Sequence, residues 1–268
     1  MARNPAHDLF DLTGKKALVT GGNSGLGLGF ARGLAKQGAD LMLWARSEEK
    51  NRAAEEDLRQ YGGQVLSRSM DVASEEAVVR QMQEAVEVMG RLDCVIANAG
   101  ISSHRPSILD LDSATYHQLL DINLHGVFYT LREAARHMVT RAKAGDPGGS
   151  IIVCGSLSVY LGVPGMAHYA AAKGGVASIM RTMAVELGQF GIRVNMVAPG
   201  YIKTDLGRDR EQTVNSATDK HFIEHTPVPR VGYPEDFEAV TAYLASDGAA
   251  FHTGDVIVID GGYLVNVY

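Results

Sequence analysis

The stretch KALVTGGNSGLG, from Lys16 to Gly27, is the part of the sequence most informative about the fold. It begins with a short apolar run that predicts a buried strand, and its glycines lead into a segment of helical period that ends near Lys36. Glycine allows a tight turn and a close approach to a phosphate, while the helix that follows offers free N–H groups at its positive end. Because the turn directly follows the first strand, the sequence predicts a pyrophosphate site there. The residues expected to form it are Gly21, Asn23, Ser24, Gly25, Leu26 and Gly27.

Apolar runs of strand length alternate with segments of helical period along the rest of the chain. The further predicted strands are 40–44, 65–70, 92–97, 150–154, 193–197 and 255–259, and the further predicted helices are 47–61, 75–89, 116–142 and 169–190. Strands that are apolar throughout and alternate with helices are typical of a parallel sheet covered on both faces. The sequence therefore predicts one α/β domain over 1–268, with a doubly wound, seven-stranded parallel sheet. Segment 202–231 shows no clear strand signal, and we expect it to cover the substrate site as a lid.

Composition indicates an ordinary globular chain and argues against several classes of protein. The 268 residues are 46% apolar, and a net charge of −6 gives no broad basic surface for nucleic acid. No apolar run approaches the ~18 residues of a membrane span, and no spacing of His or Cys suggests a metal site. Cys94 and Cys154 lie in apolar runs, which favours buried free thiols. We therefore expect a cytoplasmic protein without a metal.

The end of the second predicted strand bears on the choice of nucleotide. In dinucleotide folds an acidic residue there binds the ribose 2′-hydroxyl, whereas an arginine accommodates a 2′-phosphate. This chain has Ala45 and Arg46 at that point, with no acid before Glu48. A guanidinium offers a phosphate a fork of donors, so NADP(H) is favoured over NAD(H). The alternative is that Arg46 only lies at a solvent-exposed edge.

A tyrosine and a lysine lie near the start of one predicted helix. Tyr169 and Lys173 are at positions i and i+4 and therefore share a face. An ammonium beside a phenol favours the phenolate, which suits a general acid/base. Ser156 directly follows the fifth predicted strand, at the edge of the sheet where ligands bind, and can donate to a substrate oxygen. Ser158 is the other candidate serine.

Together these motifs resemble those of the classical short-chain dehydrogenase/reductase family, and the resemblance covers nearly the whole chain. TGGNSGLG, from Thr20 to Gly27, is similar to the family's TGxxxGxG turn. ANAG, from Ala97 to Gly100, is similar to its NNAG element, with alanine in place of the first asparagine. PGYIKT, from Pro199 to Thr204, resembles its PGxxxT segment, and DGG at 260–262 resembles its C-terminal motif. The resemblance implies a Rossmann-type fold and hydride transfer between a nicotinamide cofactor and a carbonyl or secondary alcohol.

The resemblance also implies roles for individual residues. It makes Tyr169 the acid/base of a catalytic tetrad, and the spacing of 13 residues before this tyrosine selects Ser156. Asn123 would hold a water in the proton relay, and Lys173 would also bind the nicotinamide ribose. The further cofactor contacts that it implies are Asp71, Val72, Asn98, Ala99, Gly100, Pro199, Gly200, Ile202 and Thr204. Relatives usually form homotetramers through the two long helices, here 116–142 and 169–190, and through the C-terminal segment.

The sequence leaves the substrate open. The candidate pocket residues, for each of which ordinary packing is the alternative, are Ser158, Met166, Tyr201 and His104. Within the family the alternatives are a 3-oxoacyl-thioester (acyl-carrier-protein) reductase, a sugar or polyol dehydrogenase, and a reductase of cyclic ketones. An acyl-carrier-protein partner would need a basic patch, for which the candidates are Arg105, Lys203, Arg208 and Arg210. A nucleotide-sensing binding module without turnover is the non-enzyme alternative.

Overall fold

Seven parallel strands form one sheet in the computed structural model, which describes residues 9–204 and 216–266. The strands are β1 (Lys16–Thr20), β2 (Asp40–Ala45), β3 (Val65–Ser69), β4 (Cys94–Ala97), β5 (Gly149–Cys154), β6 (Ile192–Pro199) and β7 (Val256–Ile259). Their order is β3-β2-β1-β4-β5-β6-β7, so the direction of winding reverses between β1 and β4. Ligands of doubly wound sheets bind at the carboxyl ends of the strands, beside such a reversal. The predicted doubly wound, seven-stranded parallel sheet is confirmed.

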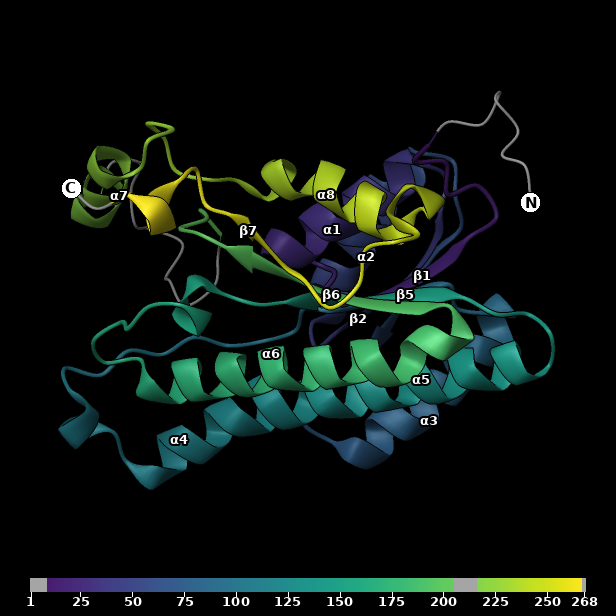
Figure 1. Cartoon of the computed structure of the whole chain (residues 1–268), viewed down its shortest axis with the longest axis horizontal. Helices are drawn as coiled ribbons and strands as arrows, with labels where there is room; N and C mark the ends of the chain where they lie inside the picture. Colours follow the sequence, from purple (N-terminus) through teal and green to yellow (C-terminus); the bar gives the residue numbers. More distant parts are fainter. Residues whose placement is uncertain (1–8, 205–215, 267–268) are drawn as a thin grey trace.

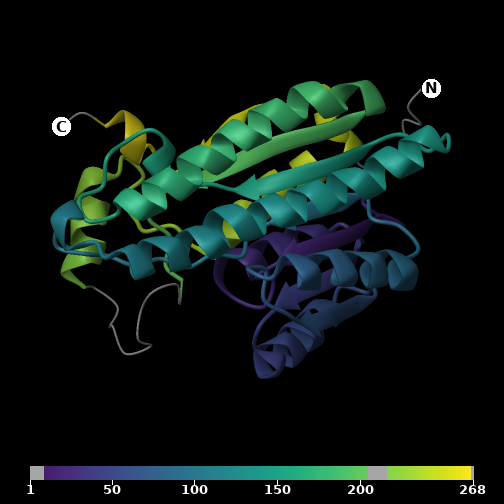
Figure 2. The same ribbon diagram turned by 90° about the horizontal axis from the view of Figure 1, so that it is seen from below.

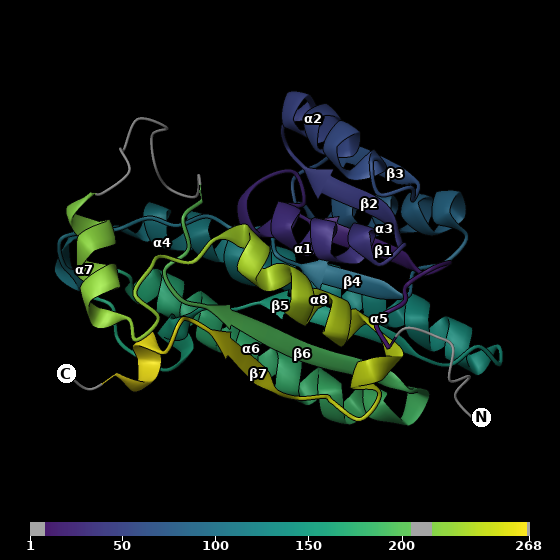
Figure 3. The same cartoon turned by 90° about the horizontal axis from the view of Figure 1, so that it is seen from above.

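Helices cover both faces of the sheet (Figure 1). One face carries α1 (Gly25–Lys36), α2 (Glu48–Arg59) and α8 (Glu238–Ala245). The other carries α3 (Glu75–Met89), α5 (Val127–Lys143) and α6 (Ala167–Leu187), and Figure 2 shows that the last two run side by side for much of their length. Two short helices, α4 (Ser113–Leu120) and α7 (Ala217–His225), lie towards one end of the molecule, with the C-terminal segment beside α7 (Figure 3).

The strands are apolar throughout because both of their faces are buried. In β1, Leu18 contributes to the core beneath α3, α5 and α6, whereas Ala17 and Val19 contribute to the core beneath α1, α2 and α8. Successive side chains of a strand point to opposite faces, so each strand supplies both cores. Hydrophobic burial on the two faces therefore fixes the register of the sheet.

Close packing between α1 and α8 depends on a glycine. A Cβ placed on Gly33 would overlap the carbonyl oxygen of Glu238 and would lie 2.8 Å from its Cα. Backbone therefore packs directly against backbone at this crossing. The contact places α1, which begins at the glycine-rich turn, directly against α8.

The structure differs from the predicted helices in three places. The segment 116–142, expected as one helix, is interrupted by a π-helical segment, Asp121–Gly126, between α4 and α5. A π-helical segment shifts the side chains on its two sides relative to one another. Helices α7 and α8 were not predicted, because neither segment shows strong helical periodicity.

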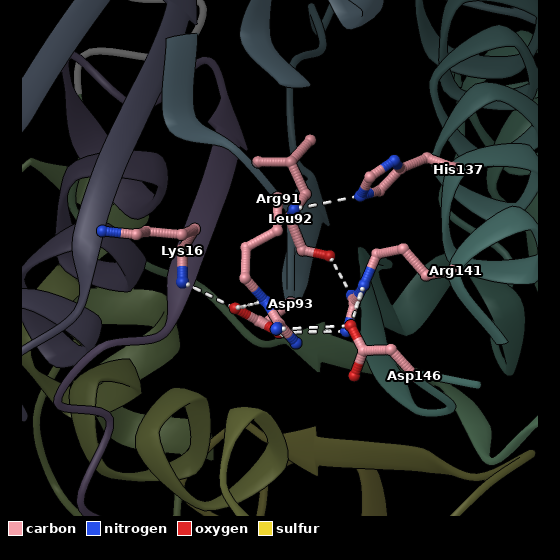
Figure 4. A network of polar contacts seen from close by, with 7 residues as sticks. All are labelled: Lys16, Arg91, Leu92, Asp93, His137, Arg141 and Asp146. Atoms are coloured by element: carbon pink, nitrogen blue, oxygen red, sulfur yellow. Dashed lines mark hydrogen bonds and ion pairs between the residues drawn. The ribbon is translucent and has the colours of Figure 1, made fainter. Parts of the chain in front are cut away.

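A network of polar contacts joins β4 to α5 at the amino ends of the strands (Figure 4). The buried Asp93 carboxylate accepts hydrogen bonds from the Lys16 backbone N–H at 3.0 Å and from Arg91 Nη2 at 2.6 Å. His137 Nε2 on α5 accepts the backbone N–H of Leu92 at 3.1 Å. Burial, followed by the charge of Arg141, lowers the pKa of His137, so the neutral ring that can accept this bond is favoured.

Candidate active site

The glycine-rich turn is anchored to the next strand at the point where the winding reverses. Thr20 Oγ1 accepts the backbone N–H groups of Asn98 and Ala99, at 2.9 and 3.0 Å. Asn98 Nδ2 in turn donates to the carbonyl oxygen of Thr20 at 3.0 Å. These bonds hold the ends of β1 and β4 together. The predicted pyrophosphate turn and the ANAG element therefore form one structure.

The geometry of the turn fits the pyrophosphate of a dinucleotide. Gly21 has φ +63°, and a Cβ placed on it would lie 2.9 Å from Asn98 Nδ2. A Cβ on Gly27 would overlap the carbonyl oxygen of Gly21, so the turn and the start of α1 need glycine. The side chain of Ser24, the residue before α1, makes no capping hydrogen bond to the helix. The free N–H groups and the positive end of this helix can therefore receive an anion.

The residues expected at the adenosine half lie where β2 and β3 end. Asn51 Nδ2 donates to the Ala45 carbonyl at 3.1 Å, and Asn51 Oδ1 accepts from Asn23 Nδ2 at 2.8 Å, so the glycine-rich turn is joined to the end of β2. The Arg46 side chain is exposed and makes no hydrogen bond or ion pair with any described residue. Asp71, after β3, accepts the backbone N–H of Ala73 at 3.0 Å, and it is followed by the buried Val72.

Asn123 lies in the π-helical segment and is fully buried. Its Oδ1 accepts the backbone N–H of Ile101 at 2.8 Å, and its Nδ2 donates to the carbonyl oxygen of the same residue at 2.8 Å. A Cβ placed on Gly100 would lie 3.2 Å from Asn123 Oδ1. The asparagine thus holds the loop after β4 against the junction of α4 and α5.

Lys173 and Tyr169 lie together on α6, as their spacing predicts. Lys173 is 4% exposed, its Nζ donates to the carbonyl oxygen of Cys154 at 2.8 Å, and Nζ lies 5.7 Å from the centroid of the Tyr169 ring. Ser156 follows β5, where its Oγ accepts the backbone N–H of Ser158 at 3.2 Å. Helix α6 packs against the turn Leu157–Val159 that carries this bond. The structure therefore brings the predicted serine, tyrosine and lysine to the carboxyl end of β5.

The segment after β6 contacts the glycine-rich turn. Gly200 N–H donates to the Ile259 carbonyl at 2.9 Å, and a Cβ on Gly200 would lie 2.7 Å from Asp260 Cα, so the PGxxxT and DGG segments pack tightly together. A Cβ on Gly25 would lie 3.2 Å from Thr204 Cβ. The residues expected to contact the cofactor therefore come from five strand ends that meet at one edge of the sheet.

Comparisons with known proteins agree with this geometry. The model of a family described as Enoyl-(Acyl carrier protein) reductase matches residues 21–264. The chain is 34% identical over 257 residues to L-rhamnose 1-dehydrogenase (NAD(P)(+)) of Sphingomonas sp. (strain SKA58), covering 96% of this chain and 98% of the relative. It is 33% identical to the 3-oxoacyl-[acyl-carrier-protein] reductase FabG of Chlamydia pneumoniae, covering 94% and 97%. A crystal structure of a putative short-chain alcohol dehydrogenase from Sinorhizobium meliloti 1021 superposes with a TM-score of 0.90 at 34% identity, covering 97% and 100%.

The chain belongs to the short-chain dehydrogenase/reductase family. It is an oxidoreductase that interconverts a ketone and a secondary alcohol with a nicotinamide cofactor. The family resemblance of the sequence motifs is therefore confirmed. Among the described residues, no helix has both the length and the apolar character needed to cross a membrane.

The candidate substrate residues of this short-chain dehydrogenase/reductase have different environments. The exposed His104 lies against the backbone of Gly165, at the start of the segment that leads into α6. Met166 is the half-buried residue before the first turn of α6, and Ser158 Oγ is buried with no hydrogen-bond partner among the described residues. Tyr201 differs from these, because its ring stacks on Phe222 of α7 with centroids 4.1 Å apart.

Three polar contacts near the site were not predicted. Ser103 Oγ and His168 Nε2 lie 2.7 Å apart and join the loop after β4 to α6, next to Tyr169. Asp219 of α7 accepts hydrogen bonds from the Tyr201 hydroxyl at 2.9 Å and from Lys203 Nζ at 3.0 Å. No sequence pattern marks these contacts, because the residues that form them are far apart in the chain or lie in segments without periodicity.

Proposed function

We propose that this short-chain dehydrogenase/reductase prefers NADP(H) and that Tyr169 is its general acid/base. The observation that carries the proposal is the position of the buried Lys173 ammonium, 5.7 Å from the centroid of the Tyr169 ring on the same helix. A phenol held next to an ammonium is suited to proton transfer, which is the role of a general acid/base.

Each member of the proposed tetrad has its own role. Tyr169 gives the proton of its hydroxyl to the substrate oxygen in reduction and takes it back in oxidation. Ser156 Oγ–H donates to the same oxygen and so stabilises the developing negative charge. Lys173 Nζ supports the phenolate, and Asn123 holds the loop after β4 in place and supports a water of the proton relay. A bound nicotinamide supplies or accepts the hydride.

The proposed cofactor site is formed by the glycine-rich turn and the neighbouring strand ends. The turn and the first turn of α1 would hold the pyrophosphate, and Asp71 with Val72 would border the adenine. Arg46 supports the preference for NADP(H), because an exposed guanidinium without a described partner can pair with a 2′-phosphate. The other proposed contacts are Asn98, Ala99, Gly100, Pro199 and Gly200, together with Ile202 and Thr204, which would contact the nicotinamide carboxamide.

A small substrate is favoured over one presented by an acyl-carrier protein. Of the basic residues expected at a carrier-protein surface, Lys203 is paired with Asp219, and Arg105 donates to Thr115 Oγ1 at 2.7 Å. Arg208 and Arg210 lie outside the described residues. Relatives named for rhamnose, sorbose and gluconate agree with a small hydroxylated substrate, but 3-oxoacyl-[acyl-carrier-protein] reductases match the chain about equally well, so the preference rests on the paired basic residues. Ser158, Met166, Tyr201 and His104 are the proposed borders of its pocket.

The remaining parts of the proposal concern the whole chain. A lid over the substrate would use 202–231, of which 205–215 lie outside the described residues and α7 forms a further part. We also propose a homotetramer. Finally, we propose a cytoplasmic location, which agrees with two buried free cysteines, one of which, Cys94, has its pKa raised to about 12 by burial.

The proposal is tested by following nicotinamide absorbance with purified protein. NADPH and NADH are supplied in parallel with ketoses, cyclic ketones and a 3-oxoacyl thioester, and NADP⁺ and NAD⁺ with polyols. We expect Tyr169→Phe to lower kcat by at least about a hundredfold, because it removes the acid/base. Arg46→Ala should lower kcat/KM with NADPH about tenfold and leave that with NADH unchanged, since a charge-assisted hydrogen bond contributes about 1.5–3 kcal/mol.

Two outcomes would contradict the proposal. Turnover by Tyr169→Phe at the wild-type rate would remove Tyr169 from the chemistry. A wild-type enzyme that uses NADH better than NADPH would refute the cofactor preference and leave the oxidoreductase intact. The matched control for loss of a surface arginine is Arg52→Ala. Arg52 lies on α2, the helix that begins just after Arg46.

A further inference from the structure

The segment Tyr201–Thr204 is bonded on one side to the chain that precedes α8. The backbone N–H of Gly232 donates to the Tyr201 carbonyl at 3.1 Å, and the N–H of Lys203 donates to the Gly232 carbonyl at 2.9 Å. Ile202 and Gly232 form an isolated parallel bridge. The segment is therefore extended, and in extended chain alternate side chains point to opposite sides. Tyr201 and Lys203 share one side, and Ile202 lies on the other, where it packs against the core beneath α1 and α8.

A single carboxylate accepts hydrogen bonds from both Tyr201 and Lys203. Asp219, in the first turn of α7, is only 2% exposed. Its Oδ1 accepts the Tyr201 hydroxyl at 2.9 Å, and its Oδ2 accepts Lys203 Nζ at 3.0 Å. The Tyr201 ring also stacks on Phe222, three residues further along α7, with an interplanar angle of 2°. Helix α7 therefore holds both residues that flank Ile202.

The charge of Asp219 is maintained at neutral pH. Burial alone would raise the pKa of this carboxyl group, but the hydrogen bonds from Lys203 and Tyr201 outweigh it and lower the pKa to about 2. A buried carboxylate that accepts bonds from an ammonium and a phenol is strongly oriented. The carboxylate therefore stays charged at neutral pH and can keep both bonds.

The other end of the segment reaches the glycine-rich turn. Thr204 packs against Gly25, on which a Cβ would lie 3.2 Å from Thr204 Cβ. Displacement of the segment would therefore move Thr204 relative to the turn, and Ile202 with it. Both residues belong to the proposed cofactor site, at the nicotinamide end.

We propose that Asp219 is a positioning residue for the nicotinamide half of the cofactor. By holding Tyr201 and Lys203 from α7, it fixes Ile202 and Thr204 against the glycine-rich turn. This inference rests on the proposed function, because it takes the nicotinamide contacts of Ile202 and Thr204 from there. Asp219 itself touches neither substrate nor cofactor in this mechanism.

The test compares a full cofactor with a fragment that lacks the nicotinamide. Affinities for NADPH and for adenosine 2′,5′-bisphosphate are measured by calorimetry for the wild type and for Asp219→Asn. We expect the variant to bind NADPH about tenfold more weakly, because one charge-assisted bond is lost and the segment is loosened. Binding of the bisphosphate should be unchanged, because that fragment reaches only the adenosine half. Glu224→Gln, an equal loss of charge on the exposed side of α7, is the control and should behave as wild type.

Further variants separate positioning from general damage. Lys203→Met and Tyr201→Phe each remove one partner of Asp219 and should weaken NADPH binding in the same direction by a smaller factor. They keep the inference testable where Asp219→Asn fails to fold, which thermal unfolding reveals. A folded Asp219→Asn protein with an unchanged ratio of the two affinities overturns the inference. Absence of turnover in the wild type counts against the proposed function alone, because neither affinity measurement needs a substrate.

Discussion

A buried lysine shows how the fold sets up the chemistry at the scale of single residues. Lys173 is almost fully buried, and a buried ammonium is tolerated only where hydrogen bonds replace water. The Cys154 carbonyl at the end of β5 supplies one such bond, at 2.8 Å. The same bond ties α6 to the strand that carries Ser156. The position of the ammonium relative to Tyr169 is therefore fixed by the sheet and not by the substrate.

His137, at the opposite end of the sheet, is expected to make stability depend on pH. Its Nε2 accepts the Leu92 N–H, and burial lowers its pKa below the ordinary value of 6.5. Between the folded pKa and 6.5, the unfolded chain binds more protons than the folded chain, so the free energy of unfolding rises with pH. The contribution of His137 is complete above about pH 6.5 and is lost as the pH falls below it.

We expect the wild type to lose more stability than His137→Gln between pH 7.5 and 5.5. The difference should approach about 1 kcal/mol, since one proton per molecule corresponds to about 1.4 kcal/mol per pH unit. Glutamine retains an acceptor for the Leu92 N–H but does not titrate. Urea unfolding of both proteins at each pH gives the measurement. Equal losses for the two proteins would show that His137 does not titrate in this way.

At the scale of elements, the contact between α1 and α8 depends on the absence of a side chain. We expect Gly33→Ala to lower the free energy of unfolding by about 1–3 kcal/mol, because its Cβ would overlap the Glu238 carbonyl. Gly174→Ala on α6 is the matched control, since a Cβ there meets nothing within 4 Å. It should instead raise stability by about 0.5–1 kcal/mol through helix propensity.

Urea unfolding at one protein concentration compares the two glycine variants. Opposite signs would support direct backbone packing between the helices. A Gly33→Ala protein as stable as wild type would mean that α8 can move away at no cost. The pair distinguishes packing from the general effect of replacing glycine.

The elements that could be predicted are those that bury a regular apolar pattern. All seven strands follow from such patterns, because both faces of the sheet are covered. The helices that connect the first six strands follow from them as well. Helix α7 could not be predicted, since it is held by Asp219 and Phe222 and not by an apolar face of its own. The π-helical segment at Asn123 is equally invisible, because helical periodicity does not reveal one inserted residue.

The candidate site could be predicted where local spacing determines contact. Tyr169 and Lys173 lie together because α6 places residues four apart on one face. Ser103 and His168 are 65 residues apart and meet only through the tertiary fold. For Tyr201 the sequence left a pocket wall and ordinary packing open, and the structure shows that its hydroxyl and ring contact α7.

On the scale of the whole molecule, the two ends of the sheet serve different purposes. The carboxyl ends hold the proposed catalytic and cofactor residues, many of which keep donors available for ligands. The amino ends hold Asp93, whose carboxylate is shared by the Lys16 backbone and two arginines, Arg91 and Arg141. This network lies away from the proposed chemistry, so changes to it should alter unfolding more than turnover.

The surface of α5 and α6 gives the last prediction, which concerns assembly. These long helices lie side by side on one face (Figure 2), and Val185 on α6 is 84% exposed in the single chain. An apolar side chain exposed on a long helix is suited to burial against another subunit.

We expect light scattering to give about four times the 28.7 kDa of one chain, and we expect Val185→Glu to reduce that mass while the protein stays folded. Val88→Glu, on α3 and 49% exposed, makes the same change outside the proposed interface and should leave the mass unchanged. A wild-type mass of one chain would refute the tetramer, whereas a full-size Val185→Glu assembly would place the contact on other elements.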